Sequence, residues 1–197
     1  MRFKIDLHNF LFNFDLSLFY KGGSVSEGYS NRTVSGDYVT FLDYDHFKLE
    51  WLEDELNKVM EKFRLTHFLI FQSSPNNFHA VNLERMRAGS FYKLLKDSSA
   101  DPSFKYVPAH VGFRSWVLRS FDKGSKDAPK FLKILKHEVH SKALFRPVSK
   151  AHFDYLIKSE LIPKELKMPI YIYLKRYMDA SHELYLTAYR CESKRLI

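Results

Sequence analysis

Between residues 38 and 96 the hydrophobic pattern changes period several times, and each change predicts an element. YVTFLDYD (38–45) and the apolar runs over 67–72 and 78–83 predict β-strands. Helical spacing over 46–64, and a shorter pattern over 86–96, predicts two helices. SSPNN, between the second and third strands, predicts a turn that pairs them antiparallel. Further strand within 103–121, centred on WVL, completes the order β-α-β-β-α-β.

The pattern differs towards both ends of the chain. The first 19 residues predict a buried strand or hairpin, and the glycine- and serine-rich segment 21–37 predicts a long loop. Beyond Ala128 the spacing predicts three or four short helices, over 128–140, over 149–161 and after Pro169. We therefore predict an α+β fold: an RRM-like antiparallel or mixed sheet with flanking helices over 1–127, and a small C-terminal helical region over 128–197.

Composition and charge narrow the function classes. No apolar run approaches the roughly 20 residues that cross a bilayer, so we expect no membrane partner. A single cysteine, Cys191, excludes an internal disulfide framework and favours a reducing cytoplasm. The net charge is +8, and residues 105–136 hold eight basic and two acidic residues. Such a block is typical of a solvated face, but its concentration in one segment also suits a polyphosphate or nucleic-acid partner.

Two aspartates end the strand over 38–45. Side chains two residues apart in a strand share a face, so Asp43 and Asp45 should project together, with Tyr44 on the opposite face. Their repulsion is costly unless a cation lies between them, and two carboxylates offer Mg²⁺ or Mn²⁺ oxygen ligands. The alternative is that these acids are solvated, or that they cap the helix beginning at His46.

The segment SSPNNFHA (73–80) places Ser74 five residues before His79. Asn76 and Asn77 tolerate left-handed backbone, so a tight turn with open amide groups is feasible. The serine hydroxyl, the backbone N–H groups and the imidazole could bind phosphate oxygens. Taken alone, His79 is better explained as a strand histidine bonded to a neighbour.

In this order, FLDYD and SPNNFH resemble motifs of the archaeo-eukaryotic primases, including the primase-polymerases of plasmids and viruses. Members of that family carry an hhhDxD strand end, a helix, and a strand–turn–strand bearing S-G-x-G-x-H in an RRM-like fold. The resemblance covers roughly residues 38–126. Pro75 and Asn77 replace both glycines of the turn.

The resemblance implies a primase-like catalytic domain over 1–127 that performs metal-dependent nucleotidyl transfer, as a DNA primase or polymerase. Asp43, Asp45 and a third acid, Asp101 or else Asp122, would hold Mg²⁺ or Mn²⁺, with His79 in the catalytic set. The residues implied to bind the nucleoside triphosphate are Ser74, His79, Arg114, Arg119 and Lys123. The lysines predicted to follow single-stranded template or primer are Lys126, Lys130 and Lys133. A replicative helicase is a candidate partner.

Two other functions remain open from sequence. A catalytically silent module with the same fold could bind single-stranded DNA in replication initiation, which the turn and the uncertain third acid favour. A rolling-circle nickase shares the topology but needs an H-x-H metal pair, which the sequence lacks. HEVH (137–140) is one residue short of the H-E-x-x-H zinc motif, so we expect no zinc there.

Overall fold

The computed structural model describes residues 2–7, 10–15, 28–33, 35–110, 115–122, 126–137, 146–175 and 188–189. The chain forms two compact units, one of residues 1–25 with 193–197 and one of residues 26–192. In the smaller unit, β1 (Arg2–Leu7) and β2 (Phe10–Asp15) pair antiparallel. Their register runs from Arg2 opposite Asp15 to Leu7 opposite Phe10. The predicted N-terminal hairpin is therefore confirmed.

The larger unit is built on a four-stranded antiparallel sheet with the order β4-β6-β5-β8. Its strands are β4 (Tyr38–Tyr44), β5 (His67–Ser74), β6 (Asn77–Met86) and β8 (Lys130–Lys136). The helix α1 (Leu49–Phe63) joins β4 to β5, and β6 lies between these two strands. The predicted pairing of β5 with β6 is confirmed, with Ile70 opposite Ala80.

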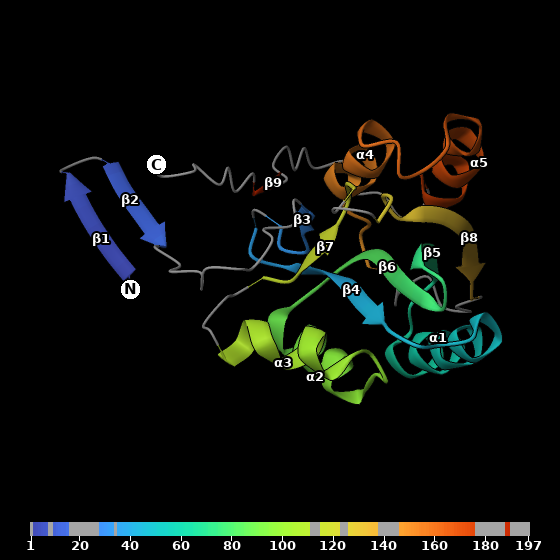
Figure 1. The fold of residues 1–197 in the computed structure, drawn as a ribbon. Coiled ribbons are helices and arrows are strands. Elements are labelled where there is room, and N and C mark those ends of the chain that lie inside the picture. The colour runs from blue at the N-terminus through green and yellow to red at the C-terminus, as the bar shows by residue number, and fades with distance from the viewer. Residues whose placement is uncertain are drawn as a thin grey trace. The chain divides into compact units, whose positions relative to one another are not determined.

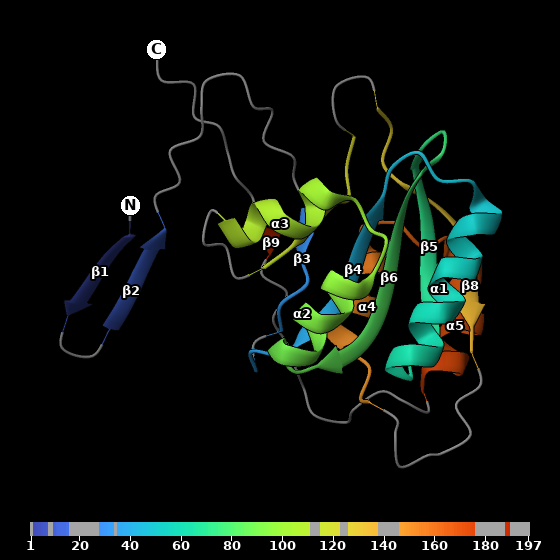
Figure 2. The same ribbon diagram turned by 90° about the horizontal axis from the view of Figure 1, so that it is seen from below.

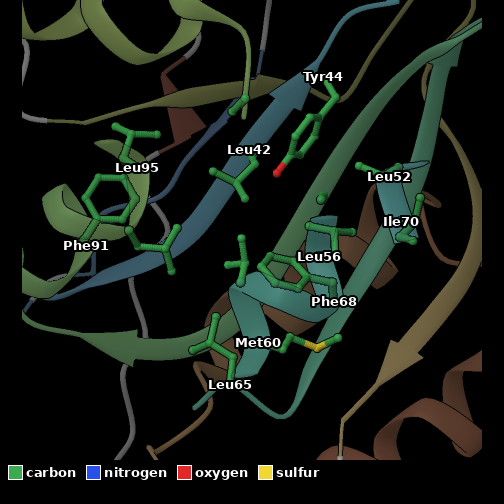
Figure 3. Close-up of a cluster of buried hydrophobic side chains, with 14 of the residues drawn as sticks. Leu42, Tyr44, Leu52, Leu56, Met60, Leu65, Phe68, Ile70, Phe91 and Leu95 are labelled. Carbon is green, nitrogen blue, oxygen red and sulfur yellow. The ribbon is translucent and has the colours of Figure 1, made fainter. Parts of the chain in front are cut away.

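Helices cover both faces of this sheet. Successive side chains of each strand point to opposite faces, and both faces carry apolar side chains that the helices bury. Figure 2 shows α1 and α2 (Ala88–Asp97) in front of the sheet, and α4 (Lys150–Lys158) and α5 (Lys164–Lys175) behind it. One buried cluster joins Leu42, Tyr44 and Ile70 to the apolar stripes of α1 and α2, as Figure 3 shows in part. The other joins Phe41 and Phe71 to residues of α4 and α5.

The end of α1 illustrates how local sequence sets an element. Leu52, Leu56, Val59 and Met60 form its buried stripe, as the helical spacing predicts. Arg64 follows the last turn in the left-handed region with φ 55°, and the Leu65 N–H donates to the Met60 carbonyl at 2.9 Å. This closure turns the chain directly into β5.

A second, smaller sheet has the order β7-β3-β9 (Figure 1). Its strands are β3 (Gly28–Ser30), β7 (Val117–Arg119) and β9 (Ala188–Tyr189). The buried Asn31 links the two sheets, because its N–H donates to the Trp116 carbonyl and its carbonyl accepts from the Val39 N–H. The strand predicted around WVL is thus present as β7, with Trp116 and Leu118 buried.

The helix predicted over 128–140 is wrong, because this segment forms the strand β8 over Lys130–Lys136. The helix α3 (Pro102–His110) was not predicted, and it precedes the confirmed strand β7. Phe131, Ile134 and Leu135 have helical spacing, but a bulge at Leu132 resets the alternation. Phe131 and Ile134 therefore reach the α4/α5 face and Leu135 the α1/α2 face.

The sequence did contain a signal for α3. Asp101 and Pro102 occupy the N-cap and first positions of that helix, where aspartate and proline are both favoured. Downstream, α4 matches a predicted helix, whereas α5 begins before Pro169 and contains it. None of the helices in the described ranges is long and apolar enough to cross a membrane.

The helices and the antiparallel sheets together make the larger unit an α+β structure.

Candidate metal and nucleotide site

The sequence-predicted acids and the predicted turn meet at one end of the four-stranded sheet, the upper end in Figure 2. Asp43 lies near the end of β4, directly opposite His79 of β6. The β5–β6 turn and the first residue of β8, Lys130, lie at this same end, with Lys130 opposite Gln72. The antiparallel register, rather than proximity in sequence, assembles the site.

Asp43 and His79 face the α4/α5 side of the sheet. Their strand neighbours Tyr44 and Phe78 belong to the buried cluster on the α1/α2 side, as the predicted alternation requires. The His79 Nε2 atom lies 3.7 Å from Asp43 Oδ1. His79 is nearly buried, whereas the Asp43 side chain is 27% exposed and Asp45 is exposed beyond the strand end. Asp43 is thus more desolvated than Asp45.

Asp101 reaches this site through the backbone. Its N–H donates to the Asp43 carbonyl at 2.7 Å, so the start of α3 lies against the end of β4. One of its carboxylate oxygens, Oδ1, accepts the Phe104 N–H at 3.0 Å and caps α3. Asp122, the second candidate for a third acid, accepts the Ala128 N–H at 2.6 Å through Oδ1. Of these two acids, Asp101 is the one whose charge acts on Asp43.

The electrostatics of Asp43 are unfavourable as the chain stands. Burial, followed by the charges of Asp45 and Asp101, raises the pKa of Asp43 to about 7, against smaller opposing effects of the Tyr44 N–H and of Arg119. Its Oδ1 atom is buried without a hydrogen-bond partner. His79 does not compensate, because burial and Arg119 lower the pKa of this histidine to about 3 and keep it neutral. A cation at Asp43 would relieve both the repulsion and the unmet oxygen.

Hydrogen bonds hold the SSPNN turn against His46 and Phe47, which directly follow Asp45. Asn76 adopts the left-handed conformation, with φ 59°, as the sequence suggested for either asparagine. The Asn77 side chain donates from Nδ2 to Ser74 Oγ at 2.7 Å and accepts the His46 N–H at 2.9 Å. The Phe47 N–H donates to the Asn76 carbonyl. These bonds tie the turn to the segment that follows Asp45, and they leave the Ser74 hydroxyl proton available to a ligand.

Arg119, at the end of β7, uses its guanidinium to organise backbone. Its Nη1 atom donates to the carbonyls of Phe121, Lys126 and Asp127 at 3.1, 3.2 and 2.6 Å, and its Nη2 donates to the Ser73 carbonyl at 3.0 Å. Sequence reasoning assigned Arg119 to the triphosphate and missed this role. Arg114 and Lys123, predicted beside it, lie outside the described residues.

Of the predicted template lysines, Lys130 and Lys133 lie on the edge strand β8 and not on a helix, and Lys126 precedes that strand. Lys126 and Lys130 are exposed at the site end of the sheet, and Lys130 pairs with Asp127 at 3.0 Å. Lys133 lies further along β8 and pairs with Glu53 of α1 at 2.9 Å. Lys126 and Lys130 are therefore better placed than Lys133 to meet a ligand at the site.

Within the described part of the chain, no three histidine, cysteine, aspartate or glutamate side chains form a ready-made metal cage. Mg²⁺ does not require one, because it is often held by one or two carboxylates together with water and substrate phosphates. The unpartnered Asp43 oxygen beside Asp45 and Asp101 fits an ion of that kind. Asp43 would hold it directly, and the charges of the sequence-predicted acids Asp45 and Asp101 would add to the attraction.

Comparison with known proteins adds no assignment: no protein-family model, no curated protein and no solved structure matches the chain.

Proposed function

We propose that this chain is a metal-dependent nucleotidyltransferase of the primase-polymerase type, acting on a single-stranded DNA template with nucleoside triphosphates, in the replication of a plasmid or virus. One observation carries the proposal. Asp43 has a buried oxygen without a hydrogen-bond partner, and the charges of Asp45 and Asp101 destabilise its ionised form, so a bound cation would offset that repulsion.

Each residue then has a defined task. Asp43 and Asp45 bind Mg²⁺ or Mn²⁺, and Asp101 adds its charge and its second carboxylate oxygen. Such an ion, when bound, supplies Lewis-acid stabilisation of phosphoryl oxygens and activates an attacking hydroxyl. The Ser74 hydroxyl and the neutral imidazole of His79 contact the triphosphate. The positive charge of Arg119 acts on the site while its guanidinium holds the adjoining backbone.

The topology of β4, β5 and β6 supports the finer fold assignment of an RRM-like sheet, and α4 and α5 support a helical region beyond β8. The strands β4 and β5 are joined by α1 and separated by β6, which is the split β-α-β arrangement of small α/β sandwiches. The acids end the first strand and the Ser74–His79 segment joins the other two, as the primase resemblance requires. The strand β8 lies beside β5, on the edge of the sheet away from β4.

A second candidate is a catalytically silent single-stranded-DNA-binding module with the same fold. Specific observations favour it: one Asp101 oxygen is committed to the cap of α3, and the Arg119 guanidinium is committed to four carbonyls. In that case the acids would remain in the fold without catalysing nucleotidyl transfer, and DNA binding would be the whole activity. A replicative helicase is a proposed partner under either function.

The test is incorporation of labelled nucleotides on a single-stranded template, with and without primer, in Mg²⁺ and in Mn²⁺. We expect product from the wild type and none from the Asp43→Ala/Asp45→Ala double variant, while DNA binding persists. Glu84→Gln is the matched control, because Glu84 is a buried acid in the same sheet outside this site. Product from the double variant would refute the metal assignment. No product from the wild type, with DNA binding retained, would select the silent module.

A further inference from the structure

Phe121 is a large apolar side chain left in solvent at the site end of the molecule. Its side chain is 43% exposed, two residues after the end of β7. Single exposed apolar residues are common on protein surfaces and need no ligand. The surroundings of Phe121 distinguish it, because Arg119 ties this position to the end of β5 beside the candidate site.

The tie consists of hydrogen bonds from one guanidinium. Arg119 Nη1 holds the carbonyls of Phe121 and Lys126 within 3.2 Å of a single nitrogen atom, and Nη2 holds the Ser73 carbonyl at 3.0 Å. Ser73 directly precedes Ser74 of the predicted triphosphate set. Through the Arg119 guanidinium, the backbone of Phe121 is therefore tied to the end of β5 that leads into the predicted turn.

The charges around Phe121 suit a polyanion. Lys126 is exposed next to it, and Lys130 follows at the start of β8. Residues 119–130 hold four basic and two acidic side chains, so the segment keeps a net positive charge although Asp127 pairs with Lys130 and Asp122 accepts the Ala128 N–H. Exposed aromatic rings beside cationic side chains are the elements that bind single-stranded nucleic acids, by base stacking and phosphate attraction.

Trp51 provides a contrast within the same molecule. It is the more exposed aromatic, at 58%, and Lys48 Nζ lies 5.0 Å from its ring centroid. However, Trp51 lies in the N-terminal half of α1 among the acids Glu50, Glu53 and Asp54. These acids would repel a phosphate backbone, so exposure of an aromatic ring alone does not select a stacking residue.

We infer that Phe121 is a stacking residue for a base of single-stranded DNA, presented by Arg119, with Lys126 and Lys130 contacting the flanking phosphates. The inference deepens the proposed function, because it names the element that holds the template or primer strand at that site. Arg119 is then a positioning residue, since it acts through the backbone of its neighbours.

Binding is measured with a fluorescently labelled oligothymidine by anisotropy, in EDTA, so that neither metal nor turnover contributes. Phe121→Ala should weaken binding about tenfold, as expected for the loss of one stacked base, and Phe121→Trp should retain wild-type affinity or exceed it. Trp51→Ala is the matched control and should leave affinity unchanged. Wild-type affinity in Phe121→Ala, or no oligothymidine binding by the wild type, would overturn the inference.

Tryptophan emission gives a second, direct readout. Wild type reports from exposed Trp51 and buried Trp116, whereas the Trp51→Phe/Phe121→Trp variant reports from position 121 in place of position 51. Stacking at position 121 should quench emission on addition of unlabelled oligothymidine in that variant and not in wild type. Equal quenching, or none at position 121, would contradict stacking. Because both measurements exclude metal, their outcome is distinct from failure of nucleotide incorporation, which tests the acids.

Discussion

Asp43 is a partly buried acid and Glu84 a fully buried acid of the same sheet, and their surroundings differ. Glu84 Oε1 accepts the Thr66 N–H and the Thr66 hydroxyl, both at 2.6 Å, and the Asn82 amide at 3.5 Å. Its Oε2 atom has no hydrogen-bond partner, as is also true of Asp43 Oδ1, but the Arg146 guanidinium lies 3.8 Å from that Oε2 atom. At Asp43 the charges of other acids act on the carboxylate, and the neutral His79 lies 3.7 Å from its Oδ1.

The groups around each carboxylate distinguish an acid with a structural role from one that could bind a ligand. Burial raises the pKa of both, but at Glu84 Thr66, Arg146 and Asn82 act to lower it. At Asp43 the neighbouring acids raise it further. A carboxylate supplied with donors holds elements together, and here it joins β6, the start of β5 and Arg146. A carboxylate supplied with like charges lacks a cation, which a ligand can provide.

The largest expected effect concerns stability. Glu84→Ala should lower the free energy of unfolding by about 3 kcal/mol, because it leaves the Thr66 N–H and hydroxyl without their acceptor and removes the carboxylate that faces the Arg146 guanidinium. Asp43→Ala should cost far less, because it removes an unpaired group. Urea unfolding of the two variants measures the difference. An equal loss in both would abolish the distinction between the two acids.

The next effect is a pH dependence specific to Asp43. Its unfolded pKa is near 4 and its folded pKa is about 7, so between these values the folded state holds a proton that the unfolded state has released. Stability relative to Asp43→Asn should therefore be unaffected below about pH 4. It should fall as pH rises from 4 to 7, by about 2 kcal/mol after allowance for partial exposure.

Unfolding of wild type and Asp43→Asn at pH 4.5 and pH 8 measures this term, since the difference cancels the contributions of the other groups. The buried histidines act in the opposite direction. Burial lowers the pKa of His67 to about 3, so its stabilising contribution is lost as pH falls below about 6.5. A flat difference between the two proteins would mean that Asp43 is not destabilised by its neighbours.

Divalent cations should stabilise the protein through Asp43 and not through Glu84. At a Mg²⁺ or Mn²⁺ concentration ten times the Kd, the wild type should gain about 1.4 kcal/mol in unfolding free energy. Asp43→Asn should gain much less, and Glu84→Gln should respond like the wild type. Thermal unfolding with and without the ion measures the effect. A response that survives Asp43→Asn would place the ion elsewhere.

The smallest expected effect separates the lysines by position. Lys126→Ala/Lys130→Ala should reduce the slope of log affinity against log salt by about 1.4 for single-stranded DNA, corresponding to two phosphate contacts. Lys133→Ala should leave the slope unchanged, because that lysine lies further along β8, away from the site. Titrations of labelled oligothymidine at several salt concentrations would measure both. A change caused only by Lys133 would move the strand path along β8.

Local pattern was sufficient where one face of an element is buried and its period is clean. The strands β4, β5 and β6 and the helices α1 and α2 follow the predicted order. The same reasoning failed at β8, because Phe131, Ile134 and Leu135 fit a helical period equally well. Pairing with β5, together with the bulge at Leu132, decided in favour of strand. Short apolar runs of this kind are ambiguous until their partners are known.

The functional groups of the site could be predicted from the sequence: two acids at the end of a strand, a serine and a histidine around a turn, and a basic segment downstream. Their contacts with one another depend on the tertiary structure. Strand register placed His79 opposite Asp43, and one backbone hydrogen bond brought Asp101 to the same place. The Arg119 side chain was directed to backbone carbonyls. The physical reason is that pKa, burial and hydrogen-bond partners depend on neighbours distant in sequence, which only folding brings together.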